Sequence, residues 1–527
     1  MRRYQLLTLI IVCLLFYALT NYGGVRSSDN EIMFRTTEAL STSGHFAVAR
    51  ELELWPKFGL AIGKDGKQYS IFCPLQAIIV VPFVVIAKQI NNTLWYKSSF
   101  TNIPVSHYVG AGFHYIVEGR RPPNVEPHAL RFLVSFFNVF ITTLAVIVFY
   151  LLLLRLGLER FPSFFTAIVF AFGTMMWPYA GTFFCEPLAI LLILISLFFL
   201  IQKSEIEISV TQRNRELIWS GLALGLAICT HITALLFVPF FMGYAFLNSW
   251  QNKNSSWRVL LSFCIGLIIP IFFLAYHNYA RFGNPLETGR WADPSRGQEL
   301  NYGSFVMPWN ALIGILINPG KSFLFFCPAI LLGLAGLRQF IKAHRLLALS
   351  LLAAIFFRVL FIACRRDWTG GFCIGPRYLL MAIPILLIPL GYLIQSLIHQ
   401  KHHTRLLLIL MLTGLIIFQQ WYFTLGEIFI YSRVAIMEWK AAGAISGDIN
   451  DVWQYSPLVH LLSVPVRGPW WLQQSTLSNG ELLVLGTVII FLLLGLILYW
   501  QFRDEISSLA VAVRAPTKSR HRMRGRS

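Results

Sequence analysis

The sequence predicts an all-α polytopic membrane protein, and two observations lead to this fold class. Of its 527 residues, 56% are hydrophobic and 13% are charged, which is about half the charged fraction of an average globular chain. Long apolar runs also recur from one end of the chain to the other, and the stretches between them are too short for a sizeable soluble domain. The eight cysteines are scattered, mostly within apolar runs, and indicate neither a disulfide framework nor a metal cluster.

Apolar runs long enough to cross a bilayer define the predicted helices, since a spanning helix needs about 20 mostly apolar residues. The first run has no small-residue cleavage site and is followed by further spans, so we interpret it as a retained anchor rather than as a signal peptide. A run at 71–90 is ambiguous because two prolines interrupt it. The other candidate spans are 4–22, 129–154, 162–178, 187–201, 216–230, 232–248, 258–279, 321–339, 346–363, 378–397, 405–424 and 480–500.

The distribution of Lys and Arg decides where 71–90 lies. If this run does not cross, the N-terminus, the basic tail and every short Lys- or Arg-containing loop lie on the cytoplasmic side, as the positive-inside rule requires. If it crosses, all of these loops move outside. We therefore predict about twelve spans, with 71–90 dipping into or lying along the outer leaflet. The net charge of +19 then reflects cytoplasmic loops rather than nucleic-acid binding, and the tail is expected to contact anionic lipid.

On this topology the outer face receives the long loops, which hold acids, arginines and aromatic residues together. One of them begins with "DNEIMFRTTEAL" (29–40), which reads as an amphipathic helix with acids in its first turn and a serine available to cap it. Asp29 would lie at the start of this helix, beside the membrane surface. An ionised carboxylate there can accept a proton from a hydroxyl group, although a lone acid at the end of a span can also be a solvated interface residue.

Residues 29–44, "DNEIMFRTTEALSTSG", resemble the first-loop acidic motif of the GT-C glycosyltransferases. These membrane enzymes move a sugar from a polyprenyl-phosphate donor on the outer face, and they include protein O-mannosyltransferases and the bacterial aminoarabinose and galacturonic acid transferases. Many members carry Asp-Glu at this point, whereas Asn30 takes the second place here. Further stretches resemble the same group, namely 63–83, 177–195, 282–291, 318–337 and 367–390. In the first of these stretches Cys73 replaces a proline.

The resemblance covers most of the chain up to about residue 390 and implies a GT-C-like bundle whose first outer loop carries amphipathic and membrane-dipping helices. It also implies that Asp29 and Glu186 are the catalytic acids. The donor phosphate needs fixed cations near the membrane plane, and Arg offers a bidentate fork for phosphate. Interfacial snorkelling is the alternative for each cation. The candidates, with Arg377 first, are Arg377, Arg365, Arg366, Arg290 and Lys321.

Other polar and aromatic residues of the outer side are candidates for contacts with the acceptor or the sugar. A belt of interfacial Trp and Tyr is the alternative for the aromatic ones, and a core histidine bonded to backbone is the alternative for the histidine. A divalent cation between Asp29 and Glu186 stays open, but no ligand set has convincing metal spacing. The candidates are Glu31, Tyr69, His231, Trp291, Trp368 and Asp367.

The predicted function is inverting transfer of a hexosyl or pentosyl group from a polyprenyl phosphate to a hydroxyl of a protein, lipid or glycan, with Asp29 as general base. The expected location is a bacterial plasma membrane, with the site facing outward. A transporter or flippase of lipid-linked sugars, a polysaccharide polymerase or ligase of another fold, and a non-catalytic family member are the alternatives. The predicted parts are a catalytic module (1–424, first outer loop 23–128), an outer segment (425–479), a last span (480–501) and a cytoplasmic tail (502–527).

Overall fold

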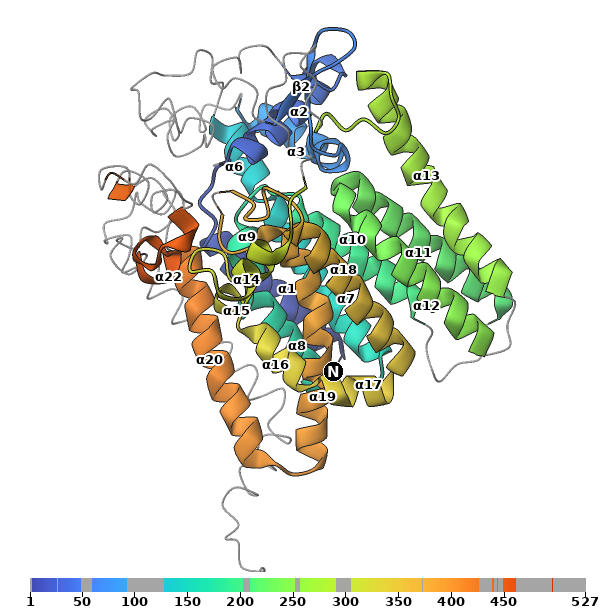
Figure 1. Cartoon of the computed structure of the whole chain (residues 1–527), viewed down its shortest axis with the longest axis vertical. Helices are drawn as coiled ribbons and strands as arrows, with labels where there is room; N and C mark the ends of the chain where they lie inside the picture. The colour runs from blue at the N-terminus through green and yellow to red at the C-terminus, as the bar shows by residue number, and fades with distance from the viewer. Residues whose placement is uncertain are drawn as a thin grey trace, which may run out of the picture.

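The fold is a bundle of long helices with a cap of short helices and a small sheet at one end (Figure 1). The predicted last span apart from residue 495, the tail, most of 425–479 and Trp291 lie outside the described residues. The computed structural model describes residues 2–25, 27–48, 59–91, 128–201, 209–251, 256–290, 305–371, 373–425, 438–439, 443, 449–460 and 495.

The long helices of the bundle correspond to predicted apolar runs. Six described segments are helical, long and apolar enough to cross a membrane, and four shorter apolar helices accompany them. The chain is therefore a multi-pass membrane protein, as predicted, while the number of twelve spans stays a prediction. The bundle helices are α1 (Arg2–Leu19), α7 (Phe137–Arg155), α8 (Arg160–Phe172), α10 (Glu186–Leu200), α11 (Val210–Thr230), α12 (Val238–Gln251), α13 (Ser256–Phe282), α18 (Arg345–Ala363), α19 (Ile383–His399) and α20 (His403–Leu425).

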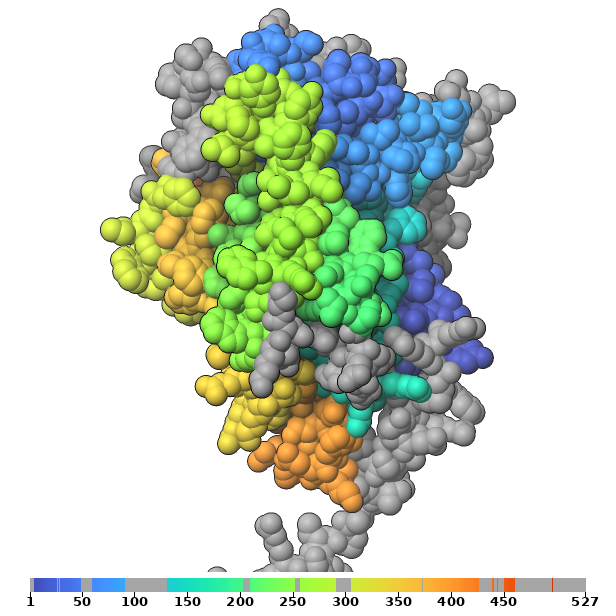
Figure 2. Space-filling view, turned by 90° about the vertical axis from the view of Figure 1, so that its right-hand side faces the viewer, coloured from blue at the N-terminus to red at the C-terminus, as the bar shows by residue number. Residues whose placement is uncertain are grey.

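Glycines let two of these helices touch backbone to backbone. A Cβ on Gly221 of α11 would lie 2.0 Å from the carbonyl oxygen of Phe263 in α13, and one on Gly266 of α13 would lie 2.0 Å from that of Ile218. Helices in lipid gain little from burying apolar surface and pack instead through small residues. On its other side α13 exposes large apolar residues such as Ile268 and Phe272. Figure 2 shows α13 running along one face of the molecule up to the first outer loop.

The predicted span 321–339 is not one continuous helix. It consists of α15 (Phe323–Phe326), α16 (Ala329–Ala335) and α17 (Leu337–Ala343). Cys327 leaves the helical region, with φ −141° and ψ 60°, because the proline that follows it disfavours helical backbone at the residue before it. The loop predicted at 280–320 also contains an apolar helix that was not predicted, α14 (Trp309–Ile317).

The described residues of the predicted first outer loop contribute to the cap of the bundle. The predicted amphipathic helix is α2 (Ser28–Ser43), and the ambiguous run 71–90 forms α3 (Leu75–Asn91). α3 packs against α2 and α6 (His128–Ser135), at the end of the bundle opposite the N-terminus (Figure 1). That 71–90 dips into or lies along the outer leaflet stays a prediction. The strands β1 (Ala47–Val48), β3 (Gln68–Ser70) and β2 (Leu60–Ile62) form an antiparallel sheet in that order.

The remaining short elements connect the long helices near the cap and on its flank. Two 3-10 helices, η3 (Ile232–Phe237) and η5 (Arg377–Ala382), lead directly into α12 and α19. A turn of the outer segment docks on the loop before α15, where Asn318 donates to Asp451 at 2.6 Å and Ser456 donates to the Pro319 carbonyl at 2.5 Å. The other elements are α9 (Met176–Ala180), η6 (Ile449–Asp451), η7 (Trp453–Tyr455) and α22 (Pro457–His460).

Candidate active site

Two acids and one arginine from distant parts of the chain meet beneath the cap. Ser27 caps α2 by accepting a hydrogen bond from the Asn30 amide at 3.2 Å, which places Asp29 in the first turn of the helix. Arg377 Nη2 donates to Asp29 Oδ2 at 2.5 Å, and Arg377 Nε lies 3.8 Å from Glu186 Oε1. All three side chains are buried. The structure thus brings together the three residues on which the sequence-based hypothesis depends.

Arg377 has one guanidinium nitrogen that makes no hydrogen bond within the described structure. Its guanidinium lies over the rings of Phe184 and Tyr378, 4.5 and 5.1 Å from their centroids. Its Nε is buried and has no hydrogen-bond partner within the described structure, and the same holds for Oδ1 of Asn30. Buried polar groups in proteins are normally paired, so orphaned ones at a cluster of charges require an explanation. A ligand that supplies an oxygen to Arg377 Nε would satisfy it.

A second ion pair extends the cluster along the loop that carries Arg377. Arg365 donates two hydrogen bonds to Asp367, at 2.8 and 2.7 Å, in the bidentate geometry that guanidinium and carboxylate favour. Tyr378 donates to the same carboxylate at 3.2 Å. Arg377 and Arg365 are therefore joined through Tyr378 and Asp367. In this structure Arg365 is neutralised by Asp367, whereas Arg366 is exposed to solvent.

The other predicted phosphate ligands are placed differently. Lys321 Nζ is buried and donates to the carbonyl oxygens of Gly371 and Cys373, at 2.6 and 2.8 Å, so it braces the loop before Arg377. Arg290 is partly buried, and its guanidinium lies 5.8 Å from the ring centroid of Phe72.

The predicted sugar contacts do not form one group. Tyr69 lies in β3 and donates to Asp65 at 2.8 Å. Trp368 packs against α14, since a Cβ on Gly314 would lie 2.5 Å from its ring. His231 stands between α11 and η3, with its ring centroid 6.2 Å from that of Tyr378. The described residues include no group of three or more His, Cys, Asp or Glu side chains that could hold a metal ion, and the Arg377 guanidinium contacts both Asp29 and Glu186.

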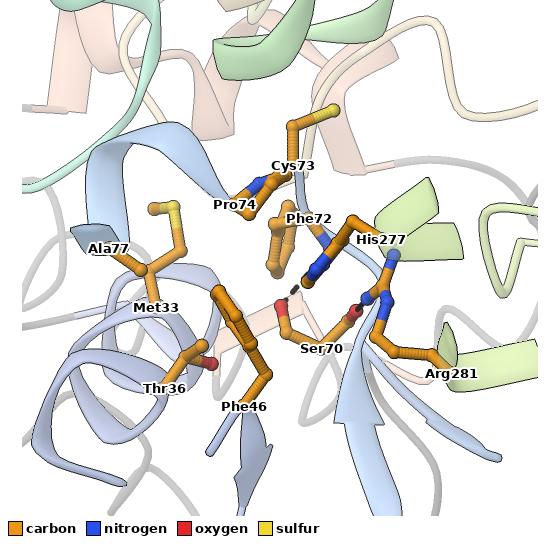
Figure 3. Close-up of a pocket in the computed structure, with 10 residues that line it drawn as sticks. All are labelled: Met33, Thr36, Phe46, Ser70, Phe72, Cys73, Pro74, Ala77, His277 and Arg281. Atoms are coloured by element: carbon orange, nitrogen blue, oxygen red, sulfur yellow. Dashed lines mark hydrogen bonds between the residues drawn. The ribbon is translucent and has the colours of Figure 1, made fainter. Parts of the chain in front are cut away.

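A small pocket lies between α2, the start of α3 and α13 (Figure 3). Met33 and Thr36 line it from α2, and Cys73 lines it just before α3. Arg281 of α13 also lines it and donates to the Ser70 carbonyl at 2.5 Å. This contact ties α13 to the first outer loop and holds the loop in place over the bundle.

Glu31 does not join the cluster, although it is two residues from Asp29. Its carboxylate accepts from Arg131 of α6 at 2.6 Å and from Arg35 at 2.9 Å. Arg131 is fully buried and was not singled out in the sequence. Its position at the start of an apolar run could have identified it as part of a buried ion pair, because an arginine within a membrane span needs a partner. The pair fixes α2 against α6 and so holds Asp29 in place.

Removing this ion pair is expected to destabilise the protein in a pH-dependent way. Burial disfavours the charged carboxylate, but the Arg131 guanidinium outweighs it and holds the pKa of Glu31 below its usual 4.5. A depressed pKa contributes stability that is present above the unfolded-state value and is lost as the pH falls through the folded-state value. Glu31→Gln should therefore lower the free energy of unfolding by about 3 kcal/mol at pH 7. Thermal unfolding in detergent at pH 7 and pH 3.5 should show the difference from wild type shrinking in acid, and an undiminished difference would contradict this account.

Two neighbouring glycines provide a matched test of how Arg377 is positioned. Gly370 and Gly371 have φ of +73° and +75°, so Ala at either site bears a similar backbone strain of about 1–2 kcal/mol. A Cβ on Gly370 would lie 2.9 Å from Arg377 Cγ, whereas one on Gly371 would meet nothing within 4 Å. Gly370→Ala is expected to lower the rate of the predicted sugar transfer about tenfold or more relative to Gly371→Ala, because small displacements of a group that acts on the substrate are costly. Equal rates for the two variants would mean that the Gly370 contact does not set the position of Arg377.

Comparisons with known proteins agree with this architecture. Residues 112–284 match the family model of dolichyl-phosphate-mannose-protein mannosyltransferases. The oligosaccharyltransferase of Archaeoglobus fulgidus, solved with a tethered acceptor peptide, has a TM-score of 0.51 at 11% identity, covering 88% of this chain and 59% of that chain. ArnT from Cupriavidus metallidurans bound to undecaprenyl phosphate has a TM-score of 0.45 at 13% identity, covering 86% of this chain and 74% of that chain. No curated protein sequence matches the chain.

The oligosaccharyltransferase shares the fold of this chain, although the chain spans about three fifths of that protein's length. The family match falls on the part that runs from the first outer loop to the end of α13. The chain is thus a multi-pass membrane protein with the fold of this oligosaccharyltransferase, and a part of it is similar to the dolichyl-phosphate-mannose-protein mannosyltransferase family.

Proposed function

We propose that the chain transfers a hexosyl or pentosyl group from a polyprenyl-phosphate donor to a hydroxyl group of a protein, lipid or glycan, with inversion at the anomeric carbon. The observation that carries the proposal is the buried cluster of Asp29, Arg377 and Glu186 at the capped end of the bundle. Transporters usually place their ionisable residues near the middle of the membrane. A cluster beneath a cap of outer-loop helices favours an enzyme.

Asp29 is the proposed general base. Its carboxylate is fixed by the α2 cap and by Arg377, so it is held at one place and in one orientation. The acceptor oxygen attacks the anomeric carbon, the bond from that carbon to the phosphate oxygen breaks, and the hydroxyl proton passes to Asp29. Polyprenyl phosphate leaves with the bonding electron pair. Positioned general bases contribute about 10²–10⁴ to the rate of such steps.

Arg377 is the proposed electrostatic partner of the leaving group. Negative charge grows on the phosphate as the bond breaks, and a preorganised cation in a site shielded from water stabilises it. The orphaned Nε of Arg377 is the donor available for a phosphate oxygen, while Nη2 holds Asp29. Glu186, 3.8 Å from that Nε, fixes the plane of the guanidinium before the donor arrives.

The proposed function includes a location for the active site and a role for the predicted outer segment. The cap faces outward from a bacterial plasma membrane, with the basic loops and tail in the cytoplasm. The segment 425–479 helps to receive the acceptor; its described turn docks on the same loop whose Lys321 braces the carbonyls before Arg377.

Transfer by the purified protein tests the proposal. The protein is reconstituted in vesicles with undecaprenyl-phosphate-linked mannose or arabinose and a membrane extract as acceptor source, and released undecaprenyl phosphate is measured by mass spectrometry. Release with at least one donor, in step with sugar entering the extract, is the expected result. Vesicles that release nothing above a protein-free control with either donor would contradict the proposed function.

A further inference from the structure

His231 caps a 3-10 helix at the capped end of the bundle, and this contact fixes which of its ring nitrogens carries the proton. The residue ends α11 and starts η3. The backbone amide of Thr233 donates to His231 Nδ1 at 3.4 Å, and the hydroxyl oxygen of Thr233 lies 2.8 Å from the same nitrogen. An amide N–H can only donate. His231 Nδ1 must therefore present a lone pair.

Arg358 completes this arrangement from the neighbouring helix α18. Its guanidinium is fully buried, and Nη1 donates to the Thr233 hydroxyl oxygen at 3.1 Å and to the Thr233 carbonyl at 3.2 Å. Since guanidinium only donates, the Thr233 oxygen accepts from Arg358 and its own hydrogen is left for His231 Nδ1. In the neutral ring the proton then belongs to Nε2.

The charges around His231 oppose a second proton. Burial, followed by the nearby charges of Arg358, Arg290, Arg365 and Arg377, lowers the pKa of His231 well below its usual 6.5. These arginines come from α18, from the loops after α13 and α18, and from η5, and the Tyr378 ring packs beside the histidine. Arg358 has no carboxylate partner within the described structure. A buried guanidinium without a carboxylate partner, bonded to the residue that contacts a neutral imidazole, describes a place for an anion.

We propose that His231 binds a phosphate oxygen of the polyprenyl-phosphate donor through Nε2–H, and that Thr233 and Arg358 are positioning residues that fix this tautomer. The inference rests on the proposed function for the identity of the anion. A neutral donor adds a hydrogen bond to the phosphate without repelling the arginines that supply the positive charge. Arg358 also donates to the Tyr378 carbonyl through Nε at 3.1 Å, so the same guanidinium positions the residue next to Arg377.

Two substitutions separate the capping contact from the proposed donor. His231→Asn keeps an acceptor for the Thr233 amide, because Asn is a good helix cap, but its short side chain has no group where Nε2–H lies. His231→Gln places an amide N–H near the Nε2 position. Binding of undecaprenyl phosphate is measured by titration in detergent for both variants and wild type, with the uncharged undecaprenol as the matched ligand.

The expected result is that His231→Asn binds undecaprenyl phosphate on the order of tenfold more weakly than wild type, since a hydrogen bond to a charged group is lost. His231→Gln should recover most of the affinity, and undecaprenol should bind all three proteins alike. Equal affinity of wild type and His231→Asn for the phosphate would overturn the inference. An equal loss in both variants, or an equal loss for undecaprenol, would also overturn it.

The tautomer is tested without any ligand by ¹⁵N spectra of histidine-labelled protein, with His231→Asn identifying the signal. An unprotonated Nδ1 and a protonated Nε2 are expected from pH 6 to pH 8, and Thr233→Val should introduce the second tautomer whereas Thr233→Ser should not. A protonated Nδ1 in wild type would overturn the inference. Failure of wild type to bind undecaprenyl phosphate while the tautomer is as expected would instead contradict the proposed function.

Discussion

Replacing Asp29 by Asn is expected to lower kcat for sugar transfer by about three orders of magnitude, while the variant still binds polyprenyl phosphate. Asn is nearly isosteric with Asp and can keep a contact with Arg377 Nη2, but it cannot take the proton of the acceptor hydroxyl. Removal of a positioned general base typically costs about 10²–10⁴ in rate. Single-turnover transfer from a bound donor isolates this step from binding and product release.

Glu38→Gln is the matched control for this experiment. Glu38 lies in the same helix as Asp29, is partly exposed and contacts Arg35 at 3.1 Å, away from the cluster. Its loss removes one negative charge from α2 without touching Arg377, and transfer should stay near the wild-type rate. If Asp29→Asn retained wild-type kcat, Asp29 would have no part in proton transfer. A comparable loss of transfer rate in Glu38→Gln would mean that the total negative charge of α2, rather than Asp29 itself, supports transfer.

Replacing Arg377 by Met is expected to abolish measurable transfer and to lower the free energy of unfolding by about 3–5 kcal/mol at pH 7. The substitution leaves Asp29 and Glu186 buried without their shared cation, and removing one partner of a buried ion pair has a cost in this range. Arg377→Lys should also be impaired, because a single ammonium group cannot reproduce the planar contacts with Asp29, Glu186 and a phosphate. Transfer rates and thermal unfolding in detergent measure the two effects separately.

The stability defect of Arg377→Met should depend on pH with a defined sign. Burial raises the pKa of Glu186, and without the guanidinium its ionised carboxylate has no partner and destabilises the fold. A raised folded-state pKa contributes stability below it that is lost as the pH rises through it. The variant should therefore approach wild-type stability at pH 5 and fall behind at pH 8. A defect of the same size at both values would mean that lost packing, not unpaired charge, causes it.

The sequence predicted the features that depend on local pattern. Apolar length identified the bundle helices, and the acids and serine before "IMF" identified α2 with Asp29 in its first turn. The distribution of Lys and Arg predicted that 71–90 belongs to the first outer loop, and α3 packs against α2 and α6 in the cap. Asp29, Glu186 and Arg377 were expected on one face, because each stands at the outer end of an apolar run. All of this information lies in spacing and charge along the chain.

Contacts between distant residues could not be predicted in the same way. Glu31 turns to Arg131 because two residues in a helix lie about 200° apart, so Glu31 faces α6 while Asp29 faces Arg377. The sequence does not tell which acid faces which partner. Lys321 at a loop could serve a phosphate or a backbone carbonyl equally well, and its partners are carbonyls of a loop 50 residues away. Arg358 lies within an apolar run, where a charged residue is expected to be buried and paired. Only the fold reveals that its guanidinium donates to Thr233.

The measurement that tests the central claim most directly is mass spectrometry of the lipid that co-purifies with wild type, Asp29→Asn and Arg377→Met. If Asp29 drives transfer and Arg377 holds the phosphate, Asp29→Asn should retain an intact sugar-phospho-prenol, wild type should carry mainly polyprenyl phosphate, and Arg377→Met should carry neither. The same membrane phospholipids on all three proteins, with no prenyl phosphate on any of them, would contradict the account.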